Sequence, residues 1–288
     1  MRVDKKSKYY YRLNRQNGLS LIELMIAMLI GIFLLAGISK SYIDSKNAST
    51  QTNQISVLED NGRYALETIT NILEKTGYTP INAEPIPSQF ITDNAEVIKT
   101  NCTDGSENVV DESIIDPTEN GSGSSSSDTL ATVFHGDSGH FTDCTGNTLP
   151  LDCRLLSLPG VNTSSEAARI YNSFSVDNDN STLNCSGSRS GASEVIAEGV
   201  ENIQFLYGLD TIDDGQVTVD RYVNASDVAG LWNNVVSVQV AILVRSLKEV
   251  RPKPVSKTFT LLDTVVTSPS DRYQRQVFST TVKLRNTL

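Results

Sequence analysis

Histidine is scarce in this chain, whose 288 residues include only His135 and His140. These two flank Gly136-Asp137-Ser138-Gly139, a serine segment of the kind that carries the nucleophile in serine proteases. Serine catalysis needs a histidine that a separate part of the fold brings to the serine, oriented by a buried aspartate. Because both histidines are neighbours of Ser138 in the sequence, we expect a turn here and no enzyme activity.

Closely spaced cysteine pairs are also missing. The four cysteines are Cys102, Cys144, Cys153 and Cys185. With the two histidines, Cys144 and Cys153 match no spacing typical of a zinc site, so neither a metal nor another cofactor is expected. Four cysteines fit an oxidising compartment, where they form disulfides. Three pairings are possible and the sequence does not decide among them. We favour the sequential one, which joins Cys102 to Cys144 and Cys153 to Cys185.

The chain has no surplus of basic residues, since 24 Lys and Arg stand against 34 Asp and Glu. Nucleic-acid binding relies on Lys and Arg that neutralise phosphates, so no nucleic-acid partner is expected. Basic residues gather instead at the N-terminus, where six of them against Asp4 give the first 18 residues a charge of +5. Such a leader stays in the cytoplasm, and the remainder is exported.

One long apolar run, residues 19–38, follows this leader. It is long enough to cross a bilayer, which takes about 20 residues. A single carboxylate, Glu23, interrupts the run, and a charge in the middle of a membrane helix costs roughly 2.5–3.5 kcal/mol on insertion scales. If the chain were cut after Gly18, the new amine of Leu19 would lie about one helical turn from Glu23. Either charge could then meet its opposite on a neighbouring helix.

The segment Gly18-Leu19-Ser20-Leu21-Ile22-Glu23-Leu24 resembles the type IV prepilin signal. Leu19 and Ser20 stand where Phe and Thr are usual, which are mild departures. The resemblance implies cleavage between Gly18 and Leu19 by a prepilin peptidase, N-methylation of Leu19, and use of Glu23 to register the subunit in a filament. An ordinary secretory signal and an uncleaved anchor are the alternatives, but this run is longer than a secretory core and no A-x-A-like site follows it.

Apolar residues recur at helical spacing beyond the anchor, up to Gly77 and Pro80. The members of this stripe are Ile55, Leu58, Ala65, Leu66, Ile69, Ile72 and Leu73. The spacing predicts one helix from near Leu19 to near Thr76, whose transmembrane part is 19–38. Gly62 is its weak point, because glycine costs about 1 kcal/mol relative to alanine inside a helix.

The remaining chain divides into two regions. Residues 78–193 are rich in Ser, Asn and Asp, and we expect an irregular insertion that contains the cysteines, with a strand only at 129–134. From residue 194 the pattern alternates, which predicts strands at 203–209, 216–222, 236–244, 257–266 and 276–285. An antiparallel meander of these strands leaves one face for the helix, so we expect an α+β fold, which the prepilin resemblance implies is pilin-like. The expected domains are 1–18, 19–77, 78–193 and 194–288.

Segments near both ends sharpen the family resemblance. They are residues 61–66, 198–208, 235–240, 243–246 and 277–286, and they resemble the PilW group of type IV pilus minor pilins. The resemblance implies a single-pass inner-membrane subunit with a periplasmic C-terminal domain. It also implies that other minor pilins, major pilins and the assembly platform are its partners while it primes pilus assembly. The subunit would then reach the pilus tip on the cell surface and help to present a tip adhesin.

Three further interpretations remain open. Asp210, Asp213, Asp214 and Asp220 are weak candidates for calcium ligands, because they do not follow the EF-hand order and a simple hairpin turn explains Asp214-Gly215. A minor pseudopilin of a type II secretion system shares the leader, helix and sheet. A membrane-anchored adhesive module would use residues 78–193 for binding.

Overall fold

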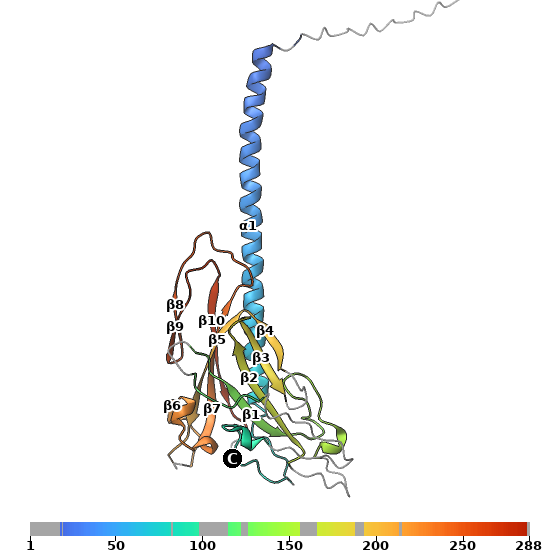
Figure 1. The fold of residues 1–288 in the computed structure, drawn as a ribbon, viewed down its shortest axis with the longest axis vertical. Helices are drawn as coiled ribbons and strands as arrows, with labels where there is room; N and C mark the ends of the chain where they lie inside the picture. The colour runs from blue at the N-terminus through green and yellow to red at the C-terminus, as the bar shows by residue number, and fades with distance from the viewer. Residues whose placement is uncertain are drawn as a thin grey trace, which may run out of the picture. The chain divides into compact units, whose positions relative to one another are not determined.

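The computed structural model describes Gly18 and residues 20–81, 83–97, 115–121, 126–155, 166–187, 193–212 and 215–286. The chain divides into two compact units, Met1–Ser49 and residues 50–288. Figure 1 shows the single α-helix of the described residues, α1, and the strands of the second unit.

Helix α1 extends from Leu21 to Leu73, close to the predicted bounds. All of its buried residues lie after residue 50, and all but the adjacent Ile72 and Leu73 are three or four residues apart, as in an amphipathic helix. They are Gln54, Leu58, Gly62, Ala65, Ile69, Ile72 and Leu73. The helix ends in a turn where Gly77 adopts φ +76°, a conformation that glycine tolerates best. The predicted stripe is therefore confirmed, except that Ile55 and Leu66 are only half-buried.

The described strands form three antiparallel sheets. The first has the order β1-β2-β3-β4, with bounds Leu130–His135, Arg169–Asp177, Thr182–Gly187 and Ser193–Glu198. The second has the order β10-β7-β5-β6, with bounds Arg275–Lys283, Val235–Arg245, Val200–Leu209 and Arg221–Val223. The third pairs β8, Thr258–Leu261, with β9, Thr264–Thr267. Short 3-10 helices lie at Asn94–Glu96, Leu151–Cys153, Ala225–Asp227 and Trp232–Asn234.

The insertion 78–193 is more regular than predicted, because it supplies β1, β2 and β3 of the first sheet. The expected strand at 129–134 is confirmed, but β2 and β3 were missed. Both are buried along most of their length, so they show no alternation, and β2 buries the polar residues Asn172 and Ser173. The polar residues here belong to buried strands, so the prediction of an irregular segment was wrong for β2 and β3.

Two details of the C-terminal sheet also differ from the prediction. The strands do not form a simple meander, because β7 pairs with β5 along its length while β6 pairs with the end of β5 at the edge of the sheet. Residues 257–266 are not one strand but the tight hairpin β8–β9, which turns at Leu262 with φ +54°. Three strands of the expected C-terminal set, β5, β7 and β10, lie close to their predicted positions.

Strand β7 lies at the centre of the second unit because both of its faces are covered. Val238, Val240 and Ile242 belong to the main core, together with the buried residues of α1. Ala241 and Leu243 point the other way and pack with Leu261 and Val266 of the β8–β9 hairpin. Since alternate residues of a strand face opposite sides, the apolar run of β7 fits a strand buried between a helix and a hairpin.

One disulfide of the described residues joins Cys144 to Cys185 on β3. The backbone N–H of Cys144 donates to Asn172 Oδ1 on β2 at 2.7 Å, so the loop that carries Cys144 lies against this sheet. The sequential pairing was therefore wrong, because the sheet brings Cys144 next to β3. Cys153 is also disulfide-bonded, and Cys102 lies outside the described residues.

Gly62 is a packing requirement rather than a weak point. A Cβ atom at this position would lie 2.5 Å from Cε2 of Phe278 on β10. The missing side chain therefore lets the helix and the sheet approach each other closely.

We expect Gly62→Ala to lower the free energy of unfolding by up to about 2 kcal/mol, because overpacking costs typically 1–3 kcal/mol and the gain of about 1 kcal/mol in helix propensity offsets only part of it. Urea unfolding of the full chain in detergent measures the change. The exposed position Ser56 on the same helix gives the matched control Ser56→Ala, which should be neutral or slightly stabilising. Adding Phe278→Leu to Gly62→Ala should restore stability, whereas a stabilised Gly62→Ala single variant would contradict the packing argument.

Asp128 links the start of β1 to the second sheet. Its carboxylate accepts hydrogen bonds from the backbone N–H groups of Gly121 and Phe205, both at 2.8 Å. The residue is only 3% exposed, and burial raises the pKa of this carboxyl to about 6, although the two N–H donors act in the opposite direction. The folded chain thus binds this proton more tightly than the unfolded chain does.

The contribution of Asp128 to stability should therefore be full below about pH 4 and lost as the pH rises from about 4 to 6. We expect this group to lower the free energy of unfolding by about 3 kcal/mol across that interval. In Asp128→Asn, which cannot titrate, that fall should disappear from unfolding curves measured between pH 4 and 6.5. An unchanged pH slope in Asp128→Asn would show that another group is responsible.

Candidate functional site

The N-terminal segment that carries the predicted processing site begins the first unit. Helix α1 starts at Leu21, where the carbonyl oxygen of Ser20 accepts hydrogen bonds from the N–H groups of Glu23 at 3.0 Å and Leu24 at 3.1 Å. Gly18 precedes the helix, and Leu19 lies outside the described residues. Glu23 occupies the first turn, where the positive end of the helix dipole favours a carboxylate.

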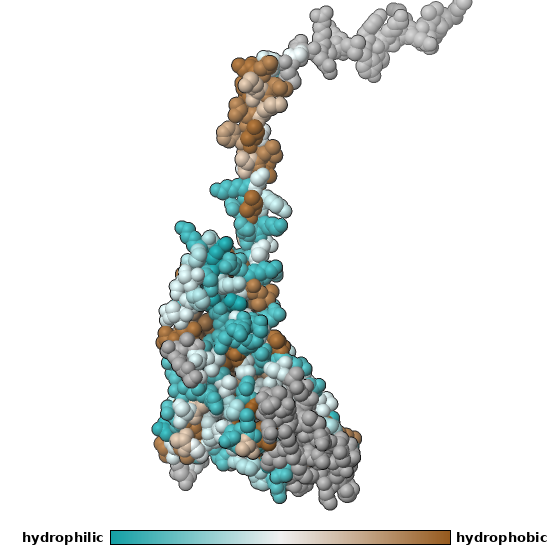
Figure 2. Space-filling view, viewed as in Figure 1, coloured by the Kyte–Doolittle hydropathy of each residue, from teal (hydrophilic) through white to brown (hydrophobic). Residues whose placement is uncertain are grey.

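The first part of α1 presents apolar side chains on all of its sides. Leu21 is 78% exposed and Phe33 is 75% exposed, and the large apolar residues between them are exposed as well. Figure 2 shows this segment as a continuous hydrophobic surface along the helix. None of the 18 most apolar consecutive residues of this helix is buried, so by length and composition the helix can cross a membrane.

Glu23 is the single charged residue between positions 21 and 39. An apolar surface this large is exceptional on a soluble monomer and marks a site that lipid or other protein surfaces cover. A carboxylate within it needs a cationic or hydrogen-bonding partner once water is removed. The chemistry that this segment supports is therefore helix packing around one charge, not catalysis.

In the second unit, α1 is fixed to the sheets by side chains from the segments that resemble the PilW group. Asn61 donates its Nδ2–H to the carbonyl oxygen of Glu198 at 2.9 Å, one residue away from Gly62 and its contact with Phe278. Asn286 donates to the carbonyl oxygens of Glu74 at 3.1 Å and Thr76 at 3.3 Å. These carbonyls at the helix end have no intrahelical partner, so Asn286 caps α1.

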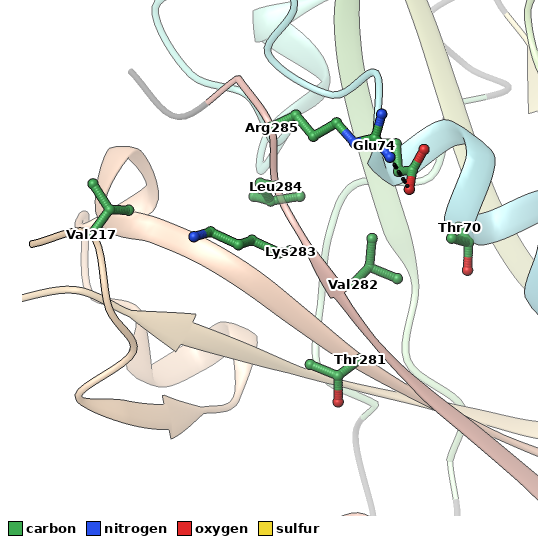
Figure 3. A pocket seen from close by; sticks show the side chains of 8 residues that line it. All are labelled: Thr70, Glu74, Val217, Thr281, Val282, Lys283, Leu284 and Arg285. Carbon is green, nitrogen blue, oxygen red and sulfur yellow. Dashed lines mark hydrogen bonds and ion pairs between the residues drawn. The ribbon is translucent and has the colours of Figure 1, made fainter.

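Figure 3 shows the pocket beside this cap, which has a volume of about 550 Å³. Its lining residues are Thr70, Glu74, Val217, Thr281, Val282, Lys283, Leu284 and Arg285. Arg285 and Glu74 form an ion pair of 2.9 Å at one side. The pocket lies at the junction of α1 and the end of β10, and Lys283, the remaining charged residue of its lining, is exposed.

Sequence reasoning missed a buried ionic cluster around Arg275, which is 5% exposed. Its guanidinium contacts Glu201 at 2.6 and 2.9 Å and Asp271 at 2.6 Å through two nitrogens. Burial alone lowers the pKa of Arg275, but the two carboxylates outweigh it and the net shift is upward. The hydrogen bonds from Arg275 hold the pKa of Asp271 below its usual value. Glu201 and Arg275 are far apart in sequence, so no local pattern signals their contact.

The segment around Ser138 forms the turn that was predicted. Asp137 Oδ1 accepts the backbone N–H groups of Gly139 and His140, both at 2.7 Å, while its Oδ2 accepts the Tyr78 hydroxyl at 2.6 Å. Burial raises the pKa of Asp137, but these donors outweigh it and the pKa falls below its ordinary value. The hydrogen bond to Asp137 raises the pKa of Tyr78 to about 12. Asp137 therefore holds the loop together.

The candidate calcium ligands are only partly described, since Asp213 and Asp214 lie outside the described residues. Asp220 Oδ2 accepts the backbone N–H groups of Thr211 at 2.6 Å and Ile212 at 2.9 Å. Asp210 Oδ2 accepts the N–H of Thr218 at 3.3 Å. These two carboxylates thus already organise the β5–β6 loop. In the part of the chain that the structure describes, no group of three or more His, Cys, Asp or Glu side chains is arranged to hold a metal ion.

Two models of known protein families match the sequence, one near each end of the chain. The family model described as type IV pilus-assembly protein W matches residues 171–286, and the model of the prokaryotic N-terminal methylation motif matches residues 13–39. The first match begins within β2, so it also includes part of the segment predicted as an insertion. No curated protein matched the sequence.

Among solved structures, a type IV-like pilin from Thermus thermophilus is similar, with 12% identity, coverage of 80% of this chain and 97% of that chain, and a TM-score of 0.42. The predicted architecture of a long N-terminal helix packed through its second part on antiparallel sheet is confirmed by the described elements. The chain is therefore similar to PilW-type pilus-assembly proteins over residues 171–286 and carries the N-terminal methylation motif of type IV pilins at residues 13–39.

Proposed function

We propose that the protein is made as a prepilin and cut between Gly18 and Leu19 by a prepilin peptidase, which exposes the amine of Leu19 for N-methylation. The match to the methylation motif over residues 13–39 supports this proposal. The charge of +5 on the first 18 residues favours a leader that remains cytoplasmic while the second unit enters the periplasm. The apolar part of α1 then holds the protein in the inner membrane as a single span.

We further propose that the mature subunit joins other minor pilins at the inner membrane and primes pilus assembly before it is carried to the tip. The observation that carries this proposal is the fully exposed apolar surface of α1 with one carboxylate in its first turn. Lipid covers such a surface in the membrane, and the helices of neighbouring subunits cover it equally well in a bundle. The second unit, with its PilW match, supplies the specific surface toward partner subunits.

Glu23 sets the axial register of α1 when the helix moves from lipid into a bundle of pilin helices. Between helices, where the dielectric constant is low, an ion pair is several times stronger than in water. A carboxylate at a fixed height on the helix therefore favours the packing that places it beside a free amine, its own or that of a neighbouring subunit. Helices that slide out of this register leave the charge unpaired in an apolar environment, which is costly.

We expect Glu23→Gln and Glu23→Ala to enter the membrane normally and to be cleaved, but to lose partner pilins. Loss of one ion pair in an apolar bundle should reduce the amount of co-purified minor pilins at least tenfold, since each 1.4 kcal/mol changes an equilibrium tenfold. Affinity purification from detergent-solubilised membranes, with pilus counts on the same cells, measures both effects. Glu23→Gln is the sharper variant because it keeps the size of the side chain.

Ile26→Ala is the matched control, since Ile26 is exposed on the same part of α1 and carries no charge. It should retain partner pilins and piliation. Normal co-purification and piliation in Glu23→Gln would contradict a role for the charge in register. Intact pili accompanied by a defect in protein secretion would instead assign the subunit to a type II secretion system.

A further inference from the structure

A small pocket lies between residues 86–96 and one face of the first sheet, and it is independent of the proposed assembly role. Its volume is about 150 Å³. Ile86, Ile91 and the cross-strand pair Val133 and Tyr171 form its apolar wall. Pro87, Ser88 and Ala95 also line the pocket, and its two charged residues are Glu96 and Arg169. The pocket thus combines an apolar wall with a guanidinium.

Arg169 is the first residue of β2 and is only 6% exposed. Its Nε is buried, and none of the residues that the structure describes accepts a hydrogen bond from it. Within the described ranges, no carboxylate lies within 4.0 Å of the guanidinium. Arginine keeps its charge in proteins, so deprotonation cannot relieve the cost of burial.

Arg275 shows how this chain treats a buried arginine elsewhere. It is buried to the same degree, yet two carboxylates, Glu201 and Asp271, bind it through several short hydrogen bonds. A buried charge without such partners is strongly destabilising. Arg169 lines a pocket instead, which is the arrangement expected where the partner comes from outside the chain.

We propose that this pocket binds a single carboxylate attached to a small apolar body. The planar guanidinium fork matches a carboxylate, with which it forms paired, charge-assisted hydrogen bonds. A volume of about 150 Å³ equals that of roughly five water molecules, which suits a carboxylate with a short hydrocarbon chain. The apolar wall of Ile86, Ile91 and Val133 faces that chain.

Glu96 restricts the charge of the ligand. Its Oε1 accepts the backbone N–H of Thr92 at 3.3 Å and the hydroxyl of the same residue at 2.7 Å. This carboxylate lines the pocket together with Arg169, so it repels additional negative charge. The site therefore favours a monocarboxylate over phosphate, sulfate or a dicarboxylate.

Isothermal titration of the full-length protein in detergent tests the proposal with butyrate, and with the neutral butyramide as the matched ligand. We expect butyrate to bind at least tenfold more tightly than butyramide, because hydrogen bonds between charged groups exceed those between neutral ones. Arg169→Gln should lose at least tenfold in butyrate affinity, whereas Glu96→Gln should bind butyrate more tightly. Arg272→Gln, which changes an exposed arginine, is the control and should bind as the native chain does.

A dipeptide, acetyl-Ala-Val with a free C-terminal carboxylate, and its amidated form distinguish the source of the carboxylate. Binding of butyrate supports a free small molecule, while binding of the acid dipeptide alone supports the end of a polypeptide, and either must depend on Arg169. Equal affinity for the acid and the amide of both probes, or binding of neither acid, would overturn the proposal. If Arg169→Gln does not fold, the Glu96→Gln variant and the acid-to-amide comparison on the native chain still decide the outcome.

Discussion

The protein depends on one constraint, which is that the apolar surface of the first part of α1 must be kept away from water. The described residues of the first unit bury none of the 18 most apolar consecutive residues of this helix. Under the proposed function, lipid covers this surface in the membrane and the helices of other pilins cover it after assembly. Glu23 is the one charge in this surface, so it makes the two environments unequal. Lipid offers a carboxylate no partner, whereas a bundle of pilins that are processed as proposed would offer amines.

The second part of the same helix solves the opposite problem, because it must bury one face permanently. Gly62 removes a side chain where Phe278 approaches, and Asn61 binds the backbone of Glu198 beside it. At the end of the helix, Asn286 donates hydrogen bonds to the carbonyl oxygens of Glu74 and Thr76. The segments that resemble the PilW group are thus largely those that fix the helix to the sheets, which gives the resemblance a structural reason.

The sequence indicated the elements whose patterns are local. Helix α1 follows from helical periodicity, and β7 and β10 follow from alternating apolar residues. Strands β2 and β3 were missed because Asn172, Ser173 and similar polar residues are buried in them, so composition resembled that of a loop. The contact of Glu201 with Arg275, the Cys144–Cys185 bond and the pocket of Arg169 join residues that are distant in sequence. The roles proposed for Leu19 and Glu23 rest on the motif and the exposed helix, and they remain predictions.

The first sheet is an integral part of the second unit, since Leu130, Phe174 and Leu183 belong to the same core as α1 and β7. Any surface function of residues 78–193 therefore rests on a packed framework.

The role of α1 depends most directly on the chemical state of its N-terminus, and mass spectrometry of the protein from purified membranes or sheared filaments measures this state. A mature chain that begins at Leu19 with a methylated amine is the expected result. A native chain that still begins at Met1 would contradict the proposed pairing of Glu23 with a processed amine.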